Sequence, residues 1–149
     1  MIFEFVKIGR PKDQFSDLVT VYQKRLERQI RFDTRVIKAQ SGENRTFEKG
    51  LIGQKHPNDH VVVLDERGTM IQSQLIANRV EGWKNSSLTK RVVFIVGGPT
   101  GISPELRRTA DDVWSLSGCV LPSDLAWLIL WEQIYRAQTI LNGSPYHNE

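Results

Sequence analysis

Apolar and polar residues along the chain follow two periods, which predict strands that alternate with helices. Short runs of β-branched and aromatic residues predict five strands, at residues 2–8, 31–38, 60–68, 91–98 and 112–117. Apolar residues that recur every three or four positions predict helices at residues 12–29, 72–84 and 124–141, with a weaker pattern at 47–54. A further helix is expected to begin after Ser103, where a capping serine precedes a proline and a glutamate.

The arrangement of these elements predicts the fold class. The strands at 60–68 and 91–98 are apolar on both faces, whereas residues 2–8 alternate between apolar and polar. Strands of the first kind, alternating with helices, are typical of an α/β fold whose mostly parallel sheet carries helices on both faces. A length of 149 residues suits one domain, and no repeat, low-complexity tract or linker divides the chain. We therefore expect a single domain over residues 1–149.

Composition narrows the classes of protein that fit. With 40% hydrophobic and 25% charged residues, the chain is globular rather than disordered. No apolar run approaches the ~20 residues that span a membrane, and the first residues do not read as a signal peptide. A single cysteine, Cys119, and three histidines without ligand spacing predict no disulfide framework and no metal site, which fits a reducing cytoplasm. The net charge of +3 permits nucleic acid as a partner without requiring it.

Three predicted strands run into glycine-containing loops, in the stretches VVVLDERG, VVFIVGGPTG and WSLSGCVLP. Ligands of open α/β sheets bind beyond the carboxyl ends of the strands, and glycine lets a ligand approach the backbone closely. The three loops therefore predict one shared pocket lined by main chain, although tight turns alone would also explain the glycines. GGPTG lacks the spacing of the dinucleotide fingerprint, and the chain has no P-loop. A pocket with little fixed charge suits a neutral or zwitterionic nucleoside.

The helix predicted at 124–141 opens with DLAWLILWEQIY, which is apolar nearly all the way round. Such a helix must be covered on most of its sides. Either it is the central helix of the core, or a second subunit covers the side that the sheet leaves open. On this pattern we favour a homodimer.

Two long stretches carry a family resemblance, FIVGGPTGISPELRRTADDVWSLSGCVLP and EQIYRAQTILNGSPYH. Both resemble the C-terminal half of the RlmH-type methyltransferases, which belong to the SPOUT superfamily. The segments YQKRL at 22–26 and LDERG at 64–68 resemble the first half of the same family. The resemblance spans almost the whole chain, and the combination of EQIYRA with a terminal PYH is its most specific part.

The resemblance implies a fold, a cofactor and a substrate. It implies a SPOUT-type α/β knot, in which a C-terminal trefoil knot holds S-adenosylmethionine, and an obligate homodimer. It also implies methylation of N3 of a pseudouridine in the intersubunit-bridge hairpin of 23S ribosomal RNA, in the large subunit or the assembled ribosome. Carried over by position, the cofactor-binding residues would be Leu64, Gly97, Leu116, Ser117, Gly118, Cys119, Val120 and Leu121.

The sequence departs from the family pattern near this site. Where the family usually reads LPHxxxR, this chain reads LPSDLAW, so Ser123 stands at the histidine position and Trp127 at the arginine position. An alternative hypothesis is therefore a catalytically diverged SPOUT-fold protein that binds the ribosome or assists its assembly. A nucleotide-binding oxidoreductase is a third hypothesis, which the missing dinucleotide fingerprint disfavours.

Methylation of N3 removes a proton, so the site needs a base or a donor that stabilises the anion. Tyr146 and His147 are expected to serve as these catalytic groups, the alternative being a frayed terminus. Arg136 is expected either to contact phosphate in the site or to form a salt bridge, and Glu132, four residues earlier, is a suitable partner. The residues 107–108, both arginine, are interpreted as a solvated helix face, with RNA backbone contact as the alternative.

Overall fold

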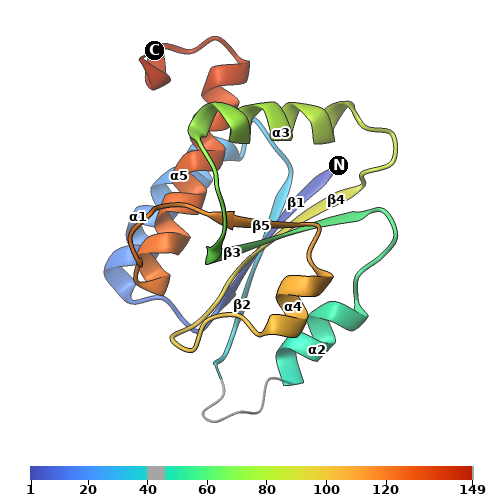
Figure 1. Cartoon of the computed structure of the whole chain (residues 1–149). Helices are drawn as coiled ribbons and strands as arrows, with labels where there is room; N and C mark the ends of the chain where they lie inside the picture. Colours follow the sequence, from blue (N-terminus) through green and yellow to red (C-terminus); the bar gives the residue numbers. More distant parts are fainter. Residues whose placement is uncertain (40–45, 149) are drawn as a thin grey trace.

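The computed structural model describes residues 1–39 and 46–148 (Figure 1). Its strands form one sheet of five parallel strands in the order β2-β1-β4-β3-β5. The strands are β1 Ile2–Ile8, β2 Phe32–Ile37, β3 Asp59–Met70, β4 Arg91–Val96 and β5 Asp112–Ser115. The predicted parallel sheet is therefore confirmed.

Helices cover both faces of the sheet, as the apolar strands require. Helices α1, α3 and α5 pack on one face, and α2 and α4 pack on the other (Figure 1). Their bounds are α1 Asp13–Leu26, α2 Thr46–Gly53, α3 Ser73–Asn85, α4 Pro104–Thr109 and α5 Ser123–Leu141. Each face of the sheet has its own cluster of buried apolar side chains, so the central strands lie between two cores.

Strand β1 lies between β2 and β4, and it is buried along nearly its whole length. Two charged residues of this strand are therefore inside the protein. Glu4 forms ion pairs with Arg35 at 3.3 Å and with Arg91 at 2.9 Å. Lys7 is only 1% exposed, and its ammonium group lies 3.8 Å from the carboxylate of Asp124 in the first turn of α5.

Helix α5 packs against both α1 and α3 on its face of the sheet (Figure 1). Trp127 and Trp131 are 2% and 0% exposed, and the Trp131 ring stacks on that of Phe5 with 3.8 Å between centroids. The sheet and two neighbouring helices thus bury these apolar residues within one chain. This arrangement supports the reading of α5 as a central core helix, and the homodimer stays a prediction that rests on the family resemblance.

The predicted capping of α4 by Ser103 is confirmed. The Ser103 hydroxyl accepts a hydrogen bond from the Leu106 N–H at 3.1 Å, which caps the helix, and Pro104 occupies its first turn. Among the described residues, no helix is long and apolar enough to cross a membrane.

The predicted end of β3 at residue 68 is wrong. The strand continues to Met70, after its pairing with β5 shifts register between Leu64 and Thr69. The two backbones come very close beside this irregularity, because a β-carbon added to Gly68 would lie 2.4 Å from the carbonyl oxygen of Val113 in β5. Glycine at position 68 is therefore a requirement of strand packing.

We expect Gly68→Ala to destabilise the fold, because the new methyl group must push β3 and β5 apart. The free energy of unfolding in urea should fall by about 1–3 kcal/mol, the usual cost of overpacking. Gly82→Ala is the matched control, since Gly82 lies in α3 with no atom within 4 Å of the added carbon. This control should gain about 0.5–1 kcal/mol from helix propensity. Equal stability of the two variants would contradict the proposed role of Gly68.

Candidate functional site

A cleft of about 640 Å³ lies at the carboxyl ends of β4 and β5 and beside the irregular stretch of β3, the strand between them. Its lining comes from this stretch of β3, from the segments that follow β4 and β5, and from the first turn of α5. Residues Leu64–Arg67, Val96–Ile102, Trp114–Ser117, Cys119–Asp124 and Ala126 line it, together with Lys12 and Phe15. The cleft lies where the glycine-containing loops predict a shared pocket, and its volume suits a nucleoside-sized ligand.

The segment after β4 forms one wall of the cleft as a tight turn. Gly98 and Gly101 form a β-bridge, the Gly101 N–H donates to the Gly98 carbonyl at 2.9 Å, and Gly101 has a φ of 70°. A β-carbon on Gly97 would lie 3.0 Å from the carbonyl group of Gly101. The tight turn thus explains the glycines sterically, and the same bare backbone faces the cleft.

The loop after β5 forms the opposite wall and is held by its own serine side chains. The Ser115 hydroxyl donates to the carbonyl oxygen of Ser117 at 2.8 Å, and the Cys119 N–H donates to the Ser117 hydroxyl at 2.9 Å. Of the predicted cofactor-binding residues, those that line the cleft are Leu64, Gly97, Leu116, Ser117, Cys119, Val120 and Leu121. Gly118 lies in the same loop but is not part of the lining, and an added β-carbon there would contact Met70.

Two carboxylates in the cleft, those of Asp65 and Asp124, have cationic neighbours. The Asp65 carboxylate, whose side chain is 6% exposed, accepts a hydrogen bond from Arg107 at 3.1 Å and lies 3.7 Å from Arg67. The reading of Arg107 as part of a solvated face is therefore wrong, whereas Arg108 is exposed. A cleft with compensated charges favours a ligand with little net charge over a polyphosphate.

Sequence reasoning missed a polar contact beneath the cleft. The hydroxyl of Ser123 and the ammonium group of Lys7 both donate to the carbonyl oxygen of Gly97. Burial lowers the pKa of Lys7, and the Asp124 carboxylate partly opposes that shift. A lysine between apolar residues in a central strand was the available signal, because a buried charge there needs partners.

The departures from the family pattern have different structural outcomes. Ser123 lines the cleft through its contact with Gly97, whereas Trp127 lies in the core, with its ring centroid 6.5 Å from that of Phe5. Ser123 therefore belongs to the site, and Trp127 belongs to the packing of α5 on the sheet.

The C-terminal tail folds back onto α5 instead of fraying. Residues Pro145–His147 form a short 3-10 helix, and the Tyr146 hydroxyl donates to the Glu132 carboxylate at 3.1 Å. Arg136 forms two hydrogen bonds with the same Glu132 oxygen, at 2.7 and 3.0 Å, which confirms the predicted ion pair. The Arg136 guanidinium also lies 3.1 Å from Nδ1 of His147, so the three predicted catalytic residues form one cluster.

These contacts set the hydrogen-bonding roles of the tail groups. Arginine is always a donor, so Nδ1 of His147 accepts from Arg136. Burial, followed by the nearby Glu132 carboxylate, raises the pKa of Tyr146 to about 12. Tyr146 is therefore protonated at neutral pH and acts as a hydrogen-bond donor, not as a base.

The tail cluster and the cleft do not coincide within one chain. His147 lines a separate hollow of about 510 Å³ with Gln72, Gln133 and Leu116, and only Leu116 also lines the cleft. Arg136 and Tyr146 line neither space.

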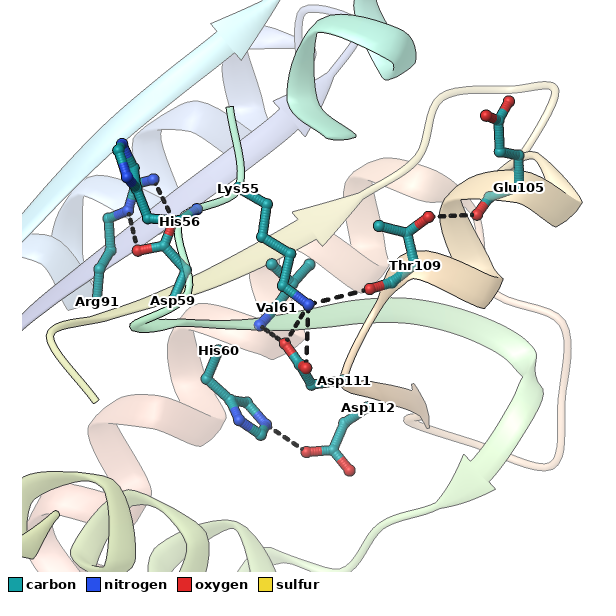
Figure 2. A network of polar contacts seen from close by, with 10 residues as sticks. All are labelled: Lys55, His56, Asp59, His60, Val61, Arg91, Glu105, Thr109, Asp111 and Asp112. Atoms are coloured by element: carbon teal, nitrogen blue, oxygen red, sulfur yellow. Dashed lines mark hydrogen bonds and ion pairs between the residues drawn. The ribbon is translucent and has the colours of Figure 1, made fainter. Parts of the chain in front are cut away.

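A second polar network lies at the opposite end of the sheet, where β3, β4 and β5 begin (Figure 2). Lys55 donates to Asp111 at 3.0 Å, and Asp59 pairs with Arg91. Burial alone raises the pKa of Asp59, but hydrogen bonds from Arg91 and from the His56 N–H outweigh it and lower that pKa. The space beside Asp59 and Arg91 is only about 30 Å³, so these pairs are interpreted as structural.

Metal chemistry receives no support from side-chain placement. Within residues 1–39 and 46–148, no group of three or more His, Cys, Asp or Glu side chains is arranged to hold a metal ion.

A parallel sheet with helices on both faces and a cleft at the carboxyl ends of β4 and β5 places the protein in the doubly wound α/β class, whose ligands bind at this edge of the sheet. Comparison with known sequences then gives the family. A sequence profile of the family described as "Predicted SPOUT methyltransferase" matches residues 1–147. The chain belongs to this SPOUT methyltransferase family.

Two curated relatives match over all or nearly all of their length. The chain is 37% identical to "Ribosomal RNA large subunit methyltransferase H" of Phocaeicola vulgatus, covering 100% of both chains. It is 34% identical to the protein of the same name from Gloeobacter violaceus, with 99% of each chain covered. Among solved structures, a probable methylase family protein from Haemophilus influenzae has a TM-score of 0.56 at 11% identity, covering 95% of this chain and 66% of that one. The last similarity concerns the fold alone.

The raised pKa of Tyr146 is testable by titration. The tyrosinate absorbance of wild type minus that of Tyr146→Phe should rise near pH 12 in the folded protein. In denaturant the same difference should rise near pH ~10, the ordinary value for tyrosine. Because the folded pKa is the higher one, the contribution of Tyr146 to stability is complete below pH ~10 and is lost as the pH rises through the folded value. A folded-state difference centred near pH ~10 would contradict the described environment of Tyr146.

Proposed function

We propose that this chain is an S-adenosylmethionine-dependent methyltransferase that acts on 23S ribosomal RNA of the large subunit, at N3 of a pseudouridine in the intersubunit-bridge hairpin. The observation that carries the proposal is the cleft lined by the irregular stretch of β3 and by the loops after β4 and β5, in a chain of the SPOUT methyltransferase family. The names of the curated relatives support ribosomal RNA as the substrate. A ribosomal substrate would place the reaction in the cytoplasm.

The cleft suits the methyl donor in chemistry as well as in size. Its backbone N–H and carbonyl groups can read the edges of an adenine ring, as glycine-lined walls allow close approach. The predicted contacts are those of Leu64, Gly97 and the loop from Leu116 to Leu121, with Gly118 as part of that loop although it lies outside the lining. Compensated charges at Asp65 and Asp124 fit the zwitterionic methionine end and the sulfonium.

The reaction is an in-line displacement. S-adenosylmethionine, held by Leu64, Gly97 and the loop from Leu116 to Leu121, would supply the methyl group, and N3 would bond to it as the carbon–sulfur bond gives up its electron pair to sulfur. The proton of N3 must leave to a base or to water. Positioning of the two reactants can supply several kcal/mol of the barrier reduction.

The tail cluster would supply the groups that face the pseudouridine. Protonated Tyr146 and the guanidinium of Arg136 can stabilise negative charge on the base, and Arg136 can also contact phosphate. Nδ1 of His147 can take up the N3 proton once its contact with Arg136 opens. Because Arg136 and Tyr146 do not line the cleft of their own chain, we propose that the homodimer brings the tail of one subunit to the cleft of the other.

A second candidate keeps the fold without the chemistry. Trp127 is buried in the core and adds no positive charge to the cleft, which favours a diverged protein that binds or helps to assemble the ribosome. Mass spectrometry of ribosomal RNA from a deletion strain separates the two, since only loss of the N3-methyl mark supports the methyltransferase. An unchanged modification pattern in that strain would leave the ribosome-binding candidate.

Calorimetric titration should show that S-adenosylmethionine binds and NAD does not. Gly97→Val should abolish this binding in a protein that still folds, because its β-carbon would lie 3.0 Å from the Gly101 carbonyl and displace the wall of the cleft. Gly53→Val is the control, since the added carbon at the end of α2 has no atom within 4 Å. Normal binding of S-adenosylmethionine by Gly97→Val would show that the turn at Gly97 does not contact the cofactor.

Truncation after Gly143 should leave S-adenosylmethionine binding nearly unchanged but lower methylation by at least about 100-fold, the scale of a lost acid–base or orienting group. A chain that ends at His147 is the control, because it keeps the contacts of Tyr146 and His147 with α5. Methylation of ribosomes by each purified chain, measured by transfer of labelled methyl groups, decides the point. Full activity without residues 144–149 would contradict a catalytic role for the tail.

A further inference from the structure

An ammonium group is buried under the carboxyl ends of β1 and β4, and the proposed reaction does not use it. The side chain of Lys7 is 2% exposed. Its Nζ donates to the carbonyl oxygen of Ile8 at 2.7 Å and lies 3.4 Å from those of Gly9 and Gly97. The carboxylate of Asp124 lies 3.8 Å away. The group thus has acceptors from two strand ends and one helix start.

Stability of the fold alone does not explain a lysine at this position. Removal of an ammonium group from water costs several kcal/mol, and a buried ion pair commonly recovers no more than it costs. The 3.8 Å separation from Asp124 is too long for a hydrogen bond, so this pair does not have the geometry of a strong one. Methionine would fill similar space without that cost, since apolar replacements of buried ion pairs are often neutral or stabilising.

The partners of Lys7 all belong to the wall of the cleft or adjoin it. Gly97 and Asp124 line the cleft, and so does Ser123, whose hydroxyl donates to the same Gly97 carbonyl. The other oxygen of Asp124 accepts the backbone N–H of Lys12 at 3.1 Å, and Lys12 also lines the cleft. Lys7 is therefore the inner end of a network that joins the end of β4, the start of α5 and the segment before α1.

We propose that Lys7 is a positioning residue for the cofactor cleft, which holds the Gly97 carbonyl and the first turn of α5 at the spacing that the methyl donor requires. The ammonium group is suited to this task because it has three donors and no acceptor, and can serve two strand ends and a carboxylate together. A neutral side chain of similar length fills the space but leaves the Ser123 hydroxyl as the hydrogen bond between the Gly97 carbonyl and α5. The inference rests on the proposed use of S-adenosylmethionine.

The test compares cofactor affinity with stability in the same variants. Lys7→Met should keep or raise the urea midpoint of unfolding. It should nevertheless raise the calorimetric Kd for S-adenosylmethionine by about 10-fold or more, which is a small part of the affinity that a misplaced binding group can lose. Lys7→Gln, which keeps neutral N–H donors near Gly97, should lose less affinity than Lys7→Met. If Lys7→Met does not fold, Lys7→Gln decides by the same comparison.

Lys55→Met is the matched control. Lys55 also joins a carbonyl, that of Thr109 at 3.2 Å, to a carboxylate, that of Asp111 at 3.0 Å, but at the opposite end of the sheet (Figure 2). This variant should bind S-adenosylmethionine with the wild-type Kd. Wild-type affinity in Lys7→Met, or a loss no greater than that of Lys55→Met, would overturn the role of Lys7 while leaving the proposed function intact. Failure of the wild-type protein to bind the cofactor would overturn both.

Discussion

The burial of a parallel sheet on both faces is the constraint on which the rest of this structure depends. The central strands carry apolar side chains on both faces, and two unequal layers of helices cover them, three helices on one side and two on the other. Parallel pairing also places all carboxyl ends at one edge. The loops after β4 and β5 therefore meet beside the irregular stretch of β3, the strand between them, and the cleft is a direct consequence of strand order.

Close approach of backbones is the second consequence. The turn from Gly97 to Gly101 packs on itself, and β3 passes β5 so closely at Gly68 that no side chain fits there. The glycines that form a wall of the cleft are thus required by packing before any ligand enters. The glycines are explained both by the tight turn and by the space for a ligand, because a residue without a side chain meets both requirements.

Buried charge is handled differently at the two ends of the sheet. At the amino ends, Asp59 with Arg91 and Lys55 with Asp111 are close pairs around little free space, and they stabilise the junctions between elements. At the carboxyl ends, Lys7 has a distant carboxylate and a set of carbonyl oxygens beside a large cleft. The pairs at the amino ends stabilise the fold. The burial of Lys7 costs solvation energy next to the place where a ligand would bind.

Sequence by itself determined the α/β class, the parallel sheet and most element positions, because hydrophobic periodicity and capping residues such as Ser103 are local properties. It also indicated the three loops of the cleft, since the carboxyl ends of parallel strands share an edge. Only the tertiary structure decided which partners the charged and large apolar side chains contact. It showed that Arg107 binds Asp65, that neighbours within the chain bury Trp127 and Trp131, and that Lys7 lies beneath Gly97. Such contacts join residues far apart in sequence, and only the packing of helices on the sheet brings them within reach of one another.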